Sequence, residues 1–306
     1  MASQVRVTGR ICKGKRIGGI NSMNSFERFN KIRNEVNRST EYISNVSVVQ
    51  SDSGFRCIHI LWLYPDVMNI HGGRGDIMGL LHICNMMDVP VEIRRCDSLR
   101  QEIDWKWPHM IFMTAGELKC VPDVISALKL QMGSEEDGSG LKGFLARGGM
   151  FIANGSSGGV LGNSVKFTDG RNITGLGLLD MEWTERESVW GDDIWVETED
   201  GLELIGNQIQ VADVKLASGQ KPLGKLVYGR GNNGSSGEEG ARSGNVIYTG
   251  VLGPLITKNP EFTASLISEA AAKTGIAVKN ELPRECIETE IRSSEYIKNF
   301  MKNKMK

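Results

Sequence analysis

The chain has 306 residues, a formal net charge of −1, and 40% hydrophobic and 24% charged residues, ordinary values for a globular protein that can bury a full core. The near-neutral charge gives no electrostatic reason to expect nucleic acid as a partner, and no apolar run approaches the ~18 residues of a membrane span. The six cysteines are scattered without a C-x-x-C pair. We therefore expect reduced thiols in a cytoplasmic protein, with no disulfide framework, no bound metal and no cofactor.

Residues 1–55 are predicted to form an N-terminal extension that is partly flexible. The charged residues near its start are all basic, a composition that targeting peptides and flexible tails share, and we favour the tail. Phe26, Phe29, Ile32 and Val36 recur at near-helical spacing and predict a small docking helix.

Strands and helices are predicted to alternate through the first half of the main domain, which we place at residues 56–278. The apolar runs that predict buried strands are 57–64, 89–93, 110–113 and 150–153, and helices are predicted near 77–84, 121–130 and 141–146. This alternation predicts an α/β fold with three layers, in which helices cover both faces of a mostly parallel central sheet.

The second half of the domain is predicted to add antiparallel strands. They fall at 178–183, 194–197, 203–211, 224–228 and 245–249, separated by turns. A glycine-rich loop at 230–237 is predicted to be flexible, and an amphipathic helix at 262–273 closes the domain. Residues 279–306 form a charged tail that we expect to be helical in part.

The segment 150–162, MFIANGSSGGVLG, predicts a strand, a tight glycine turn and the start of a helix. Enzymes use this geometry to lift a nucleophile above a sheet. Ser156 and Ser157 occupy the turn, but a serine needs a base to accept its proton, and the chain has no histidine after His109. We interpret both serines as small residues that serve the turn.

A glycine pattern at Gly73, Gly75 and Gly79, with Glu92 further on, imitates a dinucleotide-binding fingerprint. The third glycine comes one residue late, and several residues separate the preceding strand from the glycines, whereas the fingerprint needs the turn directly at the strand end. The sequence also lacks a G-x-x-x-x-G-K-[ST] phosphate loop. We therefore expect no nucleotide cofactor.

The segment LYPDVMNIHGGRGD at 63–76 strongly resembles the opening motif of the glutaminase subunit of bacterial lipid II isoglutaminyl synthase, a cobyric-acid-synthase-like class I glutamine amidotransferase. The resemblance continues in the family's order at 168–170, 173–180, 222–229, 231–233 and 252–260, and so spans most of residues 57–275. It implies the three-layer, flavodoxin-like fold of class I glutamine amidotransferases. We expect the motif loop, with Asn69, His71, Arg74 and Asp76, to be exposed.

In this family a cysteine at the strand–turn–helix elbow attacks the amide of glutamine, a histidine relays protons, and the released ammonia passes to an ATP-dependent ligase partner that amidates the peptidoglycan stem. Carried over by position, the cysteine falls on Gly155 and the histidine on Leu252. The resemblance further implies a vestigial glutamine pocket. Its oxyanion strand end falls on Thr114, Ala115 and Gly116, and the nearest match to a glutamine-holding arginine is Arg186. The remaining pocket positions are Ser156, Ser157, Asn207 and Gln208.

Loss of both chemical groups predicts a chain without glutaminase activity, since removing either member of such a pair costs about 10⁴–10⁶ in rate. The first hypothesis is a non-catalytic subunit that binds a Mur-ligase-like protein or a glutaminase paralogue in cell-wall precursor amidation. The second is an enzyme or binding protein of different chemistry, in which Gly155 leaves space for another small ligand. The third is an active glutaminase that borrows residues from a neighbouring chain and supplies ammonia to a ligase.

Overall fold

The computed structural model describes residues 42–44, 56–278 and 282–306. Most of the N-terminal extension, including the docking helix predicted around residues 26–36, lies outside these residues. Residues 42–44 form strand β1, which pairs with the central sheet, so this part of the extension is attached to the main domain.

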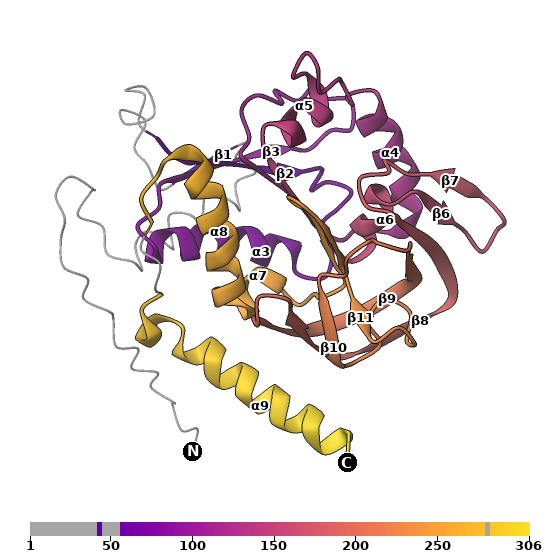
Figure 1. Cartoon of the computed structure of the whole chain (residues 1–306), viewed down its shortest axis with the longest axis vertical. Helices are drawn as coiled ribbons and strands as arrows, with labels where there is room; N and C mark the ends of the chain where they lie inside the picture. The colour runs from indigo at the N-terminus through magenta and orange to yellow at the C-terminus, as the bar shows by residue number, and fades with distance from the viewer. Residues whose placement is uncertain (1–41, 45–55, 279–281) are drawn as a thin grey trace, which may run out of the picture.

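A seven-stranded sheet forms the centre of the molecule, in the order β1-β3-β2-β4-β5-β13-β12 (Figure 1). The five inner strands are parallel, and β1 and β12 are antiparallel to their neighbours at the two edges. The inner strands come from the continuous apolar runs of the sequence because both faces of a parallel sheet are covered. The strands are β1 (Tyr42–Ser44), β2 (Ile58–Leu63), β3 (Val91–Cys96), β4 (Met110–Met113), β5 (Met150–Asn154), β12 (Ala241–Ser243) and β13 (Val246–Thr249).

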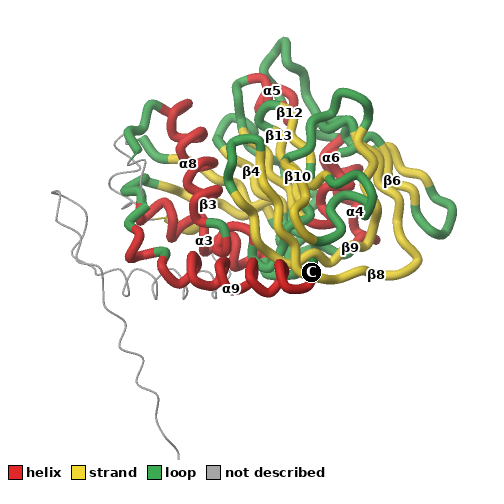
Figure 2. Tube along the Cα trace, turned by 60° about the horizontal axis from the view of Figure 1, so that its bottom comes forward, coloured by secondary structure: helices red, strands yellow, loops and turns green. Residues whose placement is uncertain are grey.

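Helices cover both faces of this sheet, as Figures 1 and 2 show. Along β2, Ile60 and Trp62 join one buried cluster, and the alternate residues Leu61 and Leu63 join the other. The three-layer α/β prediction is thus confirmed. The first face carries α3 (Gly73–Met86), α7 (Leu255–Lys258) and α8 (Pro260–Thr274), and the second carries α4 (Val121–Lys129), α5 (Gly140–Ala146) and α6 (Gly158–Leu161).

A second sheet, of six mostly antiparallel strands, confirms the change predicted for the second half of the domain. Its longest strand, β8, runs unbroken over Met181–Thr198, where the sequence predicts two short strands. Residues 185–193 are exposed or half-buried and include a bulge, so they carry no apolar run that would predict a strand. The other strands are β6 (Ser164–Lys166), β7 (Asn172–Thr174), β9 (Glu203–Leu216), β10 (Gly224–Tyr228) and β11 (Glu238–Glu239).

The charged C-terminal segment forms helix α9 (Glu288–Lys304), which lies along the second sheet (Figure 2). Met301 is fully buried against Trp195 and Ile205. The ammonium groups of Lys298 and Lys302 lie 5.5 and 5.3 Å from the centroid of the Trp195 ring. This apolar anchor, the cation–π contacts, and the ion pairs Lys298–Glu203 and Lys304–Asp192 hold an otherwise polar helix in place.

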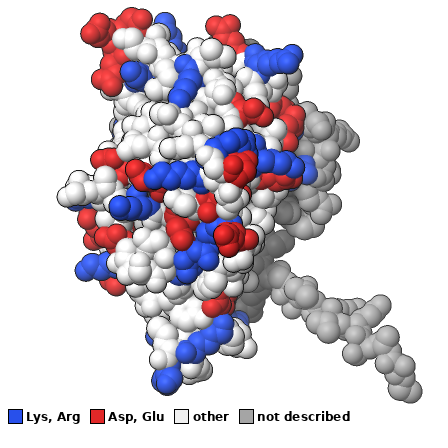
Figure 3. All heavy atoms as spheres, turned by 90° about the vertical axis from the view of Figure 1, so that its right-hand side faces the viewer, with Lys and Arg blue, Asp and Glu red and all other residues white. Residues whose placement is uncertain are grey.

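The face drawn in Figure 3 has no large basic or acidic patch, because basic and acidic side chains are interspersed over it. Among the described residues, no helix combines the length and the apolarity that crossing a membrane requires.

Candidate functional site

The predicted strand–turn–helix elbow lies at the carboxyl edge of the central sheet. Strand β5 ends at Asn154, a 3₁₀ turn covers Gly155–Ser157, and α6 follows directly. Gly155 has φ +58°, a left-handed conformation that glycine adopts without steric cost. Ligands of open α/β sheets bind at this edge, so this is where a catalytic group is expected.

The space above Gly155 is filled. A Cβ built on Gly155 would lie 2.8 Å from the Cβ of Ala115 and 3.0 Å from Cδ2 of Leu252. Leu252 is itself buried, with 2% of its surface exposed. The expectation that this glycine leaves room for a ligand is therefore wrong, because two apolar side chains occupy the place into which a side chain would project.

Backbone N–H groups at the end of β4 are already engaged within the chain. The N–H of Ala115 donates to Oδ1 of Asn154 at 3.1 Å, and the N–H of Gly116 donates to Oγ of Ser156 at 3.0 Å. The Ser156 hydroxyl in turn donates to the Gly116 carbonyl, and the Thr114 hydroxyl donates to the carbonyl of Met68. An oxyanion would have to displace these partners to use the same N–H groups.

The two serines of the turn are buried and contact backbone carbonyls. The Oγ of Ser157 lies 2.7 Å from the carbonyl oxygen of Asn154 and 3.0 Å from that of Met113. Together with the Ser156–Gly116 bonds, these contacts join the turn to the ends of β4 and β5.

Asn207 and Gln208 of β9 point in opposite directions, as neighbours on a strand do. Asn207 forms a two-bond backbone bridge to Leu252, and its side chain contacts Asp193 at 3.2 Å and Lys258 at 3.3 Å. Gln208 is buried and its amide holds the 230–231 segment, donating to the Gly231 carbonyl at 2.7 Å and accepting from the Gly231 N–H at 3.1 Å.

Arg186 belongs to a separate ion-pair cluster on β8 and β9. Its guanidinium donates to both carboxylate oxygens of Asp213, at 2.9 and 3.0 Å, and Arg230 contacts the same carboxylate at 3.0 Å. The structure thus pairs Arg186 with Asp213, whereas the resemblance assigns it to a glutamine pocket.

The motif loop is exposed at Asn69, His71 and Arg74, but Asp76 is buried, with 1% of its surface exposed. The expectation that Asp76 is exposed is wrong because α3 begins at Gly73, four residues earlier than predicted, and its first turn faces inward. The Asp76 carboxylate accepts from the N–H of Ile256 at 2.8 Å, and its burial raises its pKa to about 7.

The glycine pattern of the motif serves close packing. A Cβ at Gly73 would lie 2.5 Å from Oγ1 of Thr114, and one at Gly75 would lie 2.7 Å from Cγ of Pro254. A Cβ at Gly79 would lie 2.7 Å from Oγ1 of Thr257. These glycines let α3 approach β4 and α7, which explains their spacing without a dinucleotide.

Sequence reasoning missed two buried polar groups at the carboxyl ends of β5 and β13. The Asn154 amide donates to Asp76 at 3.4 Å as well as accepting from Ala115. Glu239 is completely buried, accepts hydrogen bonds from Thr249 and the Gly250 N–H, and has a pKa that burial raises to about 7. Local hydrophobic periodicity contains no signal for either group.

Comparison with known proteins finds sequence similarity to glutaminase subunits. No protein-family model matches the chain. It is 25% identical over 221 residues to the lipid II isoglutaminyl synthase (glutamine-hydrolyzing) subunit GatD of Streptococcus pneumoniae, covering 71% of this chain and 81% of the relative. The GatD subunit of Staphylococcus aureus is 24% identical over 225 residues, covering 72% and 88%. These matches confirm the predicted homology to GatD.

Comparison with solved structures finds weaker likenesses. A crystal structure of a glutamine amidotransferase has a TM-score of 0.43 and 12% identity, covering 69% of this chain and 98% of that chain. The glutaminase domain of Trypanosoma brucei CTPS with bound acivicin has a TM-score of 0.41 and 8% identity, covering 74% and 98%.

Proposed function

We propose that this chain is a catalytically inactive glutaminase-like subunit that works by binding a protein partner in the amidation of a peptidoglycan precursor. The partner we propose is a Mur-ligase-like protein or a glutaminase paralogue, in the cytoplasm. The similarity to GatD supports the assignment, because it covers 81% of a protein whose name describes a subunit of a glutamine-hydrolyzing synthase.

The observation that carries the proposal is the contact between Gly155 and Leu252. By resemblance these positions correspond to a nucleophilic cysteine and to the histidine that serves it, and the two lie side by side. A thiol attacks only when it can project toward the substrate and a base can accept its proton. An apolar contact at this point supplies neither group.

The occupied N–H groups of Ala115 and Gly116 support the same proposal. Donors that stabilise a tetrahedral intermediate must aim at the oxygen on which charge develops, and each is worth about 10²–10³ in rate. Here Asn154 and Ser156 accept those hydrogen bonds. The same packing also weakens the alternative of another ligand bound directly above Gly155.

We assign partner binding to the exposed part of the motif loop. Asn69, His71 and Arg74 are exposed beside the elbow edge, and Ile70 between them is a large apolar side chain with 36% of its surface exposed. The glycines behind the loop let it pack closely against Thr114 and Pro254. A loop that is packed from behind and exposes an apolar residue among polar ones suits protein recognition.

Glutamine hydrolysis is tested with the purified chain, alone and mixed with a Mur-ligase-like protein from the same genome, by measuring glutamate release. GatD of Streptococcus pneumoniae serves as the positive control. We expect no release above buffer in either mixture. Release that a Ser156→Ala substitution abolishes would overturn the inactive assignment.

Partner binding is tested by co-expressing the chain with the Mur-ligase-like protein and separating the products by size-exclusion chromatography. We expect a complex that Arg74→Ala weakens and that Arg292→Ala, which removes an exposed arginine on α9, leaves unchanged. Monomers that co-elute with neither the ligase nor a glutaminase paralogue would contradict the proposed role.

A further inference from the structure

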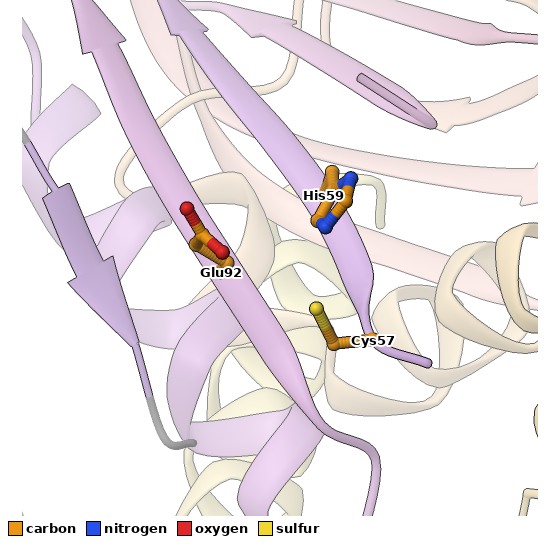
Figure 4. Close-up of side chains that lie close together, drawn as sticks. All are labelled: Cys57, His59 and Glu92. Atoms are coloured by element: carbon orange, nitrogen blue, oxygen red, sulfur yellow. The ribbon is translucent and has the colours of Figure 1, made fainter. Parts of the chain in front are cut away.

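Three potential metal ligands meet at the amino edge of the central sheet, opposite the elbow. Cys57 precedes β2, His59 lies in β2, and Glu92 lies in the neighbouring strand β3. Each residue offers one possible ligand atom, the sulfur of Cys57, a ring nitrogen of His59 and a carboxylate oxygen of Glu92, and these three atoms lie within 4.8 Å of one another. Figure 4 shows the three side chains close together. The fold dictates this meeting, because Cys57 and His59 are two residues apart on one strand face and His59 is in register with Glu92.

One ring nitrogen of His59 already has a hydrogen-bond partner, and the other can bind a metal. Its Nδ1 lies 2.9 Å from the carbonyl oxygen of Trp107, which can only accept, so Nδ1 carries the proton and Nε2 keeps the lone pair. The imidazole is stacked between the rings of Trp107, at 4.5 Å, and His109, at 4.8 Å.

The other two donors are buried and have capacity to bind. Glu92 is 6% exposed, and Arg94 contacts one of its oxygens, Oε1, at 2.9 Å. The second oxygen lies outside this ion pair. Cys57 is 5% exposed, and its sulfur lies within 4.8 Å of the ligand atoms of His59 and Glu92.

We propose that Cys57, His59 and Glu92 bind one zinc ion. Thiolate, imidazole and carboxylate are the three ligand types of zinc sites, whereas magnesium and calcium prefer oxygen alone. Zinc bonds of about 2.0–2.3 Å place tetrahedral ligands about 3.3–3.8 Å apart, so shifts of about 1 Å close the cluster around the ion. Water takes the fourth position.

The binding step is balanced in charge and protons. The ion displaces the proton of the Cys57 thiol to solvent and forms a zinc–sulfur bond, so one proton leaves for each zinc bound. The thiolate and the Glu92 carboxylate then supply two negative charges beside the positive charges of zinc and Arg94, so the occupied site, Arg94 included, carries one net positive charge. Arg94, whose guanidinium lies 4.1 Å from the centroid of the Trp107 ring, holds the carboxylate in place.

The same three residue types occur in thiol hydrolases, but this cysteine is poorly suited to attack. Reactive cysteines are partly exposed and have a lowered pKa, whereas Cys57 is buried and its pKa is raised. Zinc would instead join β2 to β3 beside the point where β1 pairs with β3. The ion thus stabilises the edge of the sheet to which the N-terminal segment attaches.

The test uses the full chain, freed of metal by a chelator and titrated with Co²⁺ and then Zn²⁺. We expect one Co²⁺ per chain, with the thiolate-to-cobalt charge-transfer band of a sulfur ligand, and full displacement by Zn²⁺. Zinc binding should release one proton per ion. Absence of the band in the wild-type chain, whatever the variants do, would overturn the proposal.

Ligand identity is tested with Cys57→Ser, His59→Gln and Glu92→Gln, each checked for folding by circular dichroism. Groups that only orient a metal ligand contribute about 10–100-fold to affinity, so loss of a ligand should weaken zinc binding by at least about 100-fold. Cys120→Ser and His82→Gln are the matched controls, because Cys120 is half-buried and His82 is exposed on α3. Equal loss in the controls would show that zinc binds elsewhere.

Discussion

Replacing Gly155 with alanine tests whether the elbow is packed closed. Its φ of +58° is unfavourable for alanine by about 1–2 kcal/mol. The new Cβ would lie 2.8 Å from Ala115 and 3.0 Å from Leu252, and overpacking of this kind costs about 1–3 kcal/mol. Gly155→Ala should therefore lower the free energy of unfolding by about 2–5 kcal/mol.

The matched control is Gly244→Ala. Gly244 has φ +54° but no heavy atom within 4 Å of a built Cβ, so this substitution carries the backbone cost without the steric one. Urea denaturation followed by circular dichroism should give a loss of about 1–2 kcal/mol for the control. The difference between the two variants measures how tightly the space above Gly155 is filled.

Equal losses in the two variants would refute the reasoning, because the elbow would then be open enough for a side chain. A double-mutant cycle adds an independent check. In a Leu252→Ala background, one of the two crowding groups is gone, so Gly155→Ala should cost less than in the wild type by about 0.5–1 kcal/mol.

Three further predictions concern activity, pH and the C-terminal helix. Gly155→Cys combined with Leu252→His should release glutamate at least about 10⁴-fold more slowly than GatD, because the occupied N–H groups and the packed space remain; comparable turnover would contradict this. Burial raises the pKa of Asp76 from 3.8 to about 7, so the folded state keeps a proton that the unfolded state loses between those values. The contribution of Asp76 to stability is therefore present at low pH and lost as pH rises through about 7. Asp76→Asn should reduce the fall in unfolding free energy, measured by urea denaturation between pH 5 and pH 8, by on the order of a few kcal/mol, and the part of the fall that Glu239 causes should remain. Met301→Ala should weaken the docking of α9 by about 2–5 kcal/mol and speed its cleavage in limited proteolysis, whereas Tyr296→Ala, at a side chain 78% exposed, should cleave like the wild type.

The fold could be predicted from the sequence wherever burial is continuous. Strand β4 (Met110–Met113) and residues 150–153 of β5 are completely buried, so each is an unbroken apolar run that the local sequence pattern reveals. The sequence pattern does not predict the part of β8 between residues 185 and 193, because that stretch is exposed or half-buried and includes a bulge. Apolar periodicity follows burial, and it is absent where a strand is exposed.

The sequence alone determined the strand–turn–helix at 150–162, the alternation that makes a parallel sheet, and the absence of a histidine after His109. These are properties of composition and of short-range periodicity, which need no knowledge of neighbours. Tertiary structure alone decided that Leu252 closes over Gly155, that Asp76 is buried beneath Ile256, and that Glu92 meets the start of β2. Each of these contacts joins residues far apart in the chain, and strand order and register, which local patterns do not encode, bring them together.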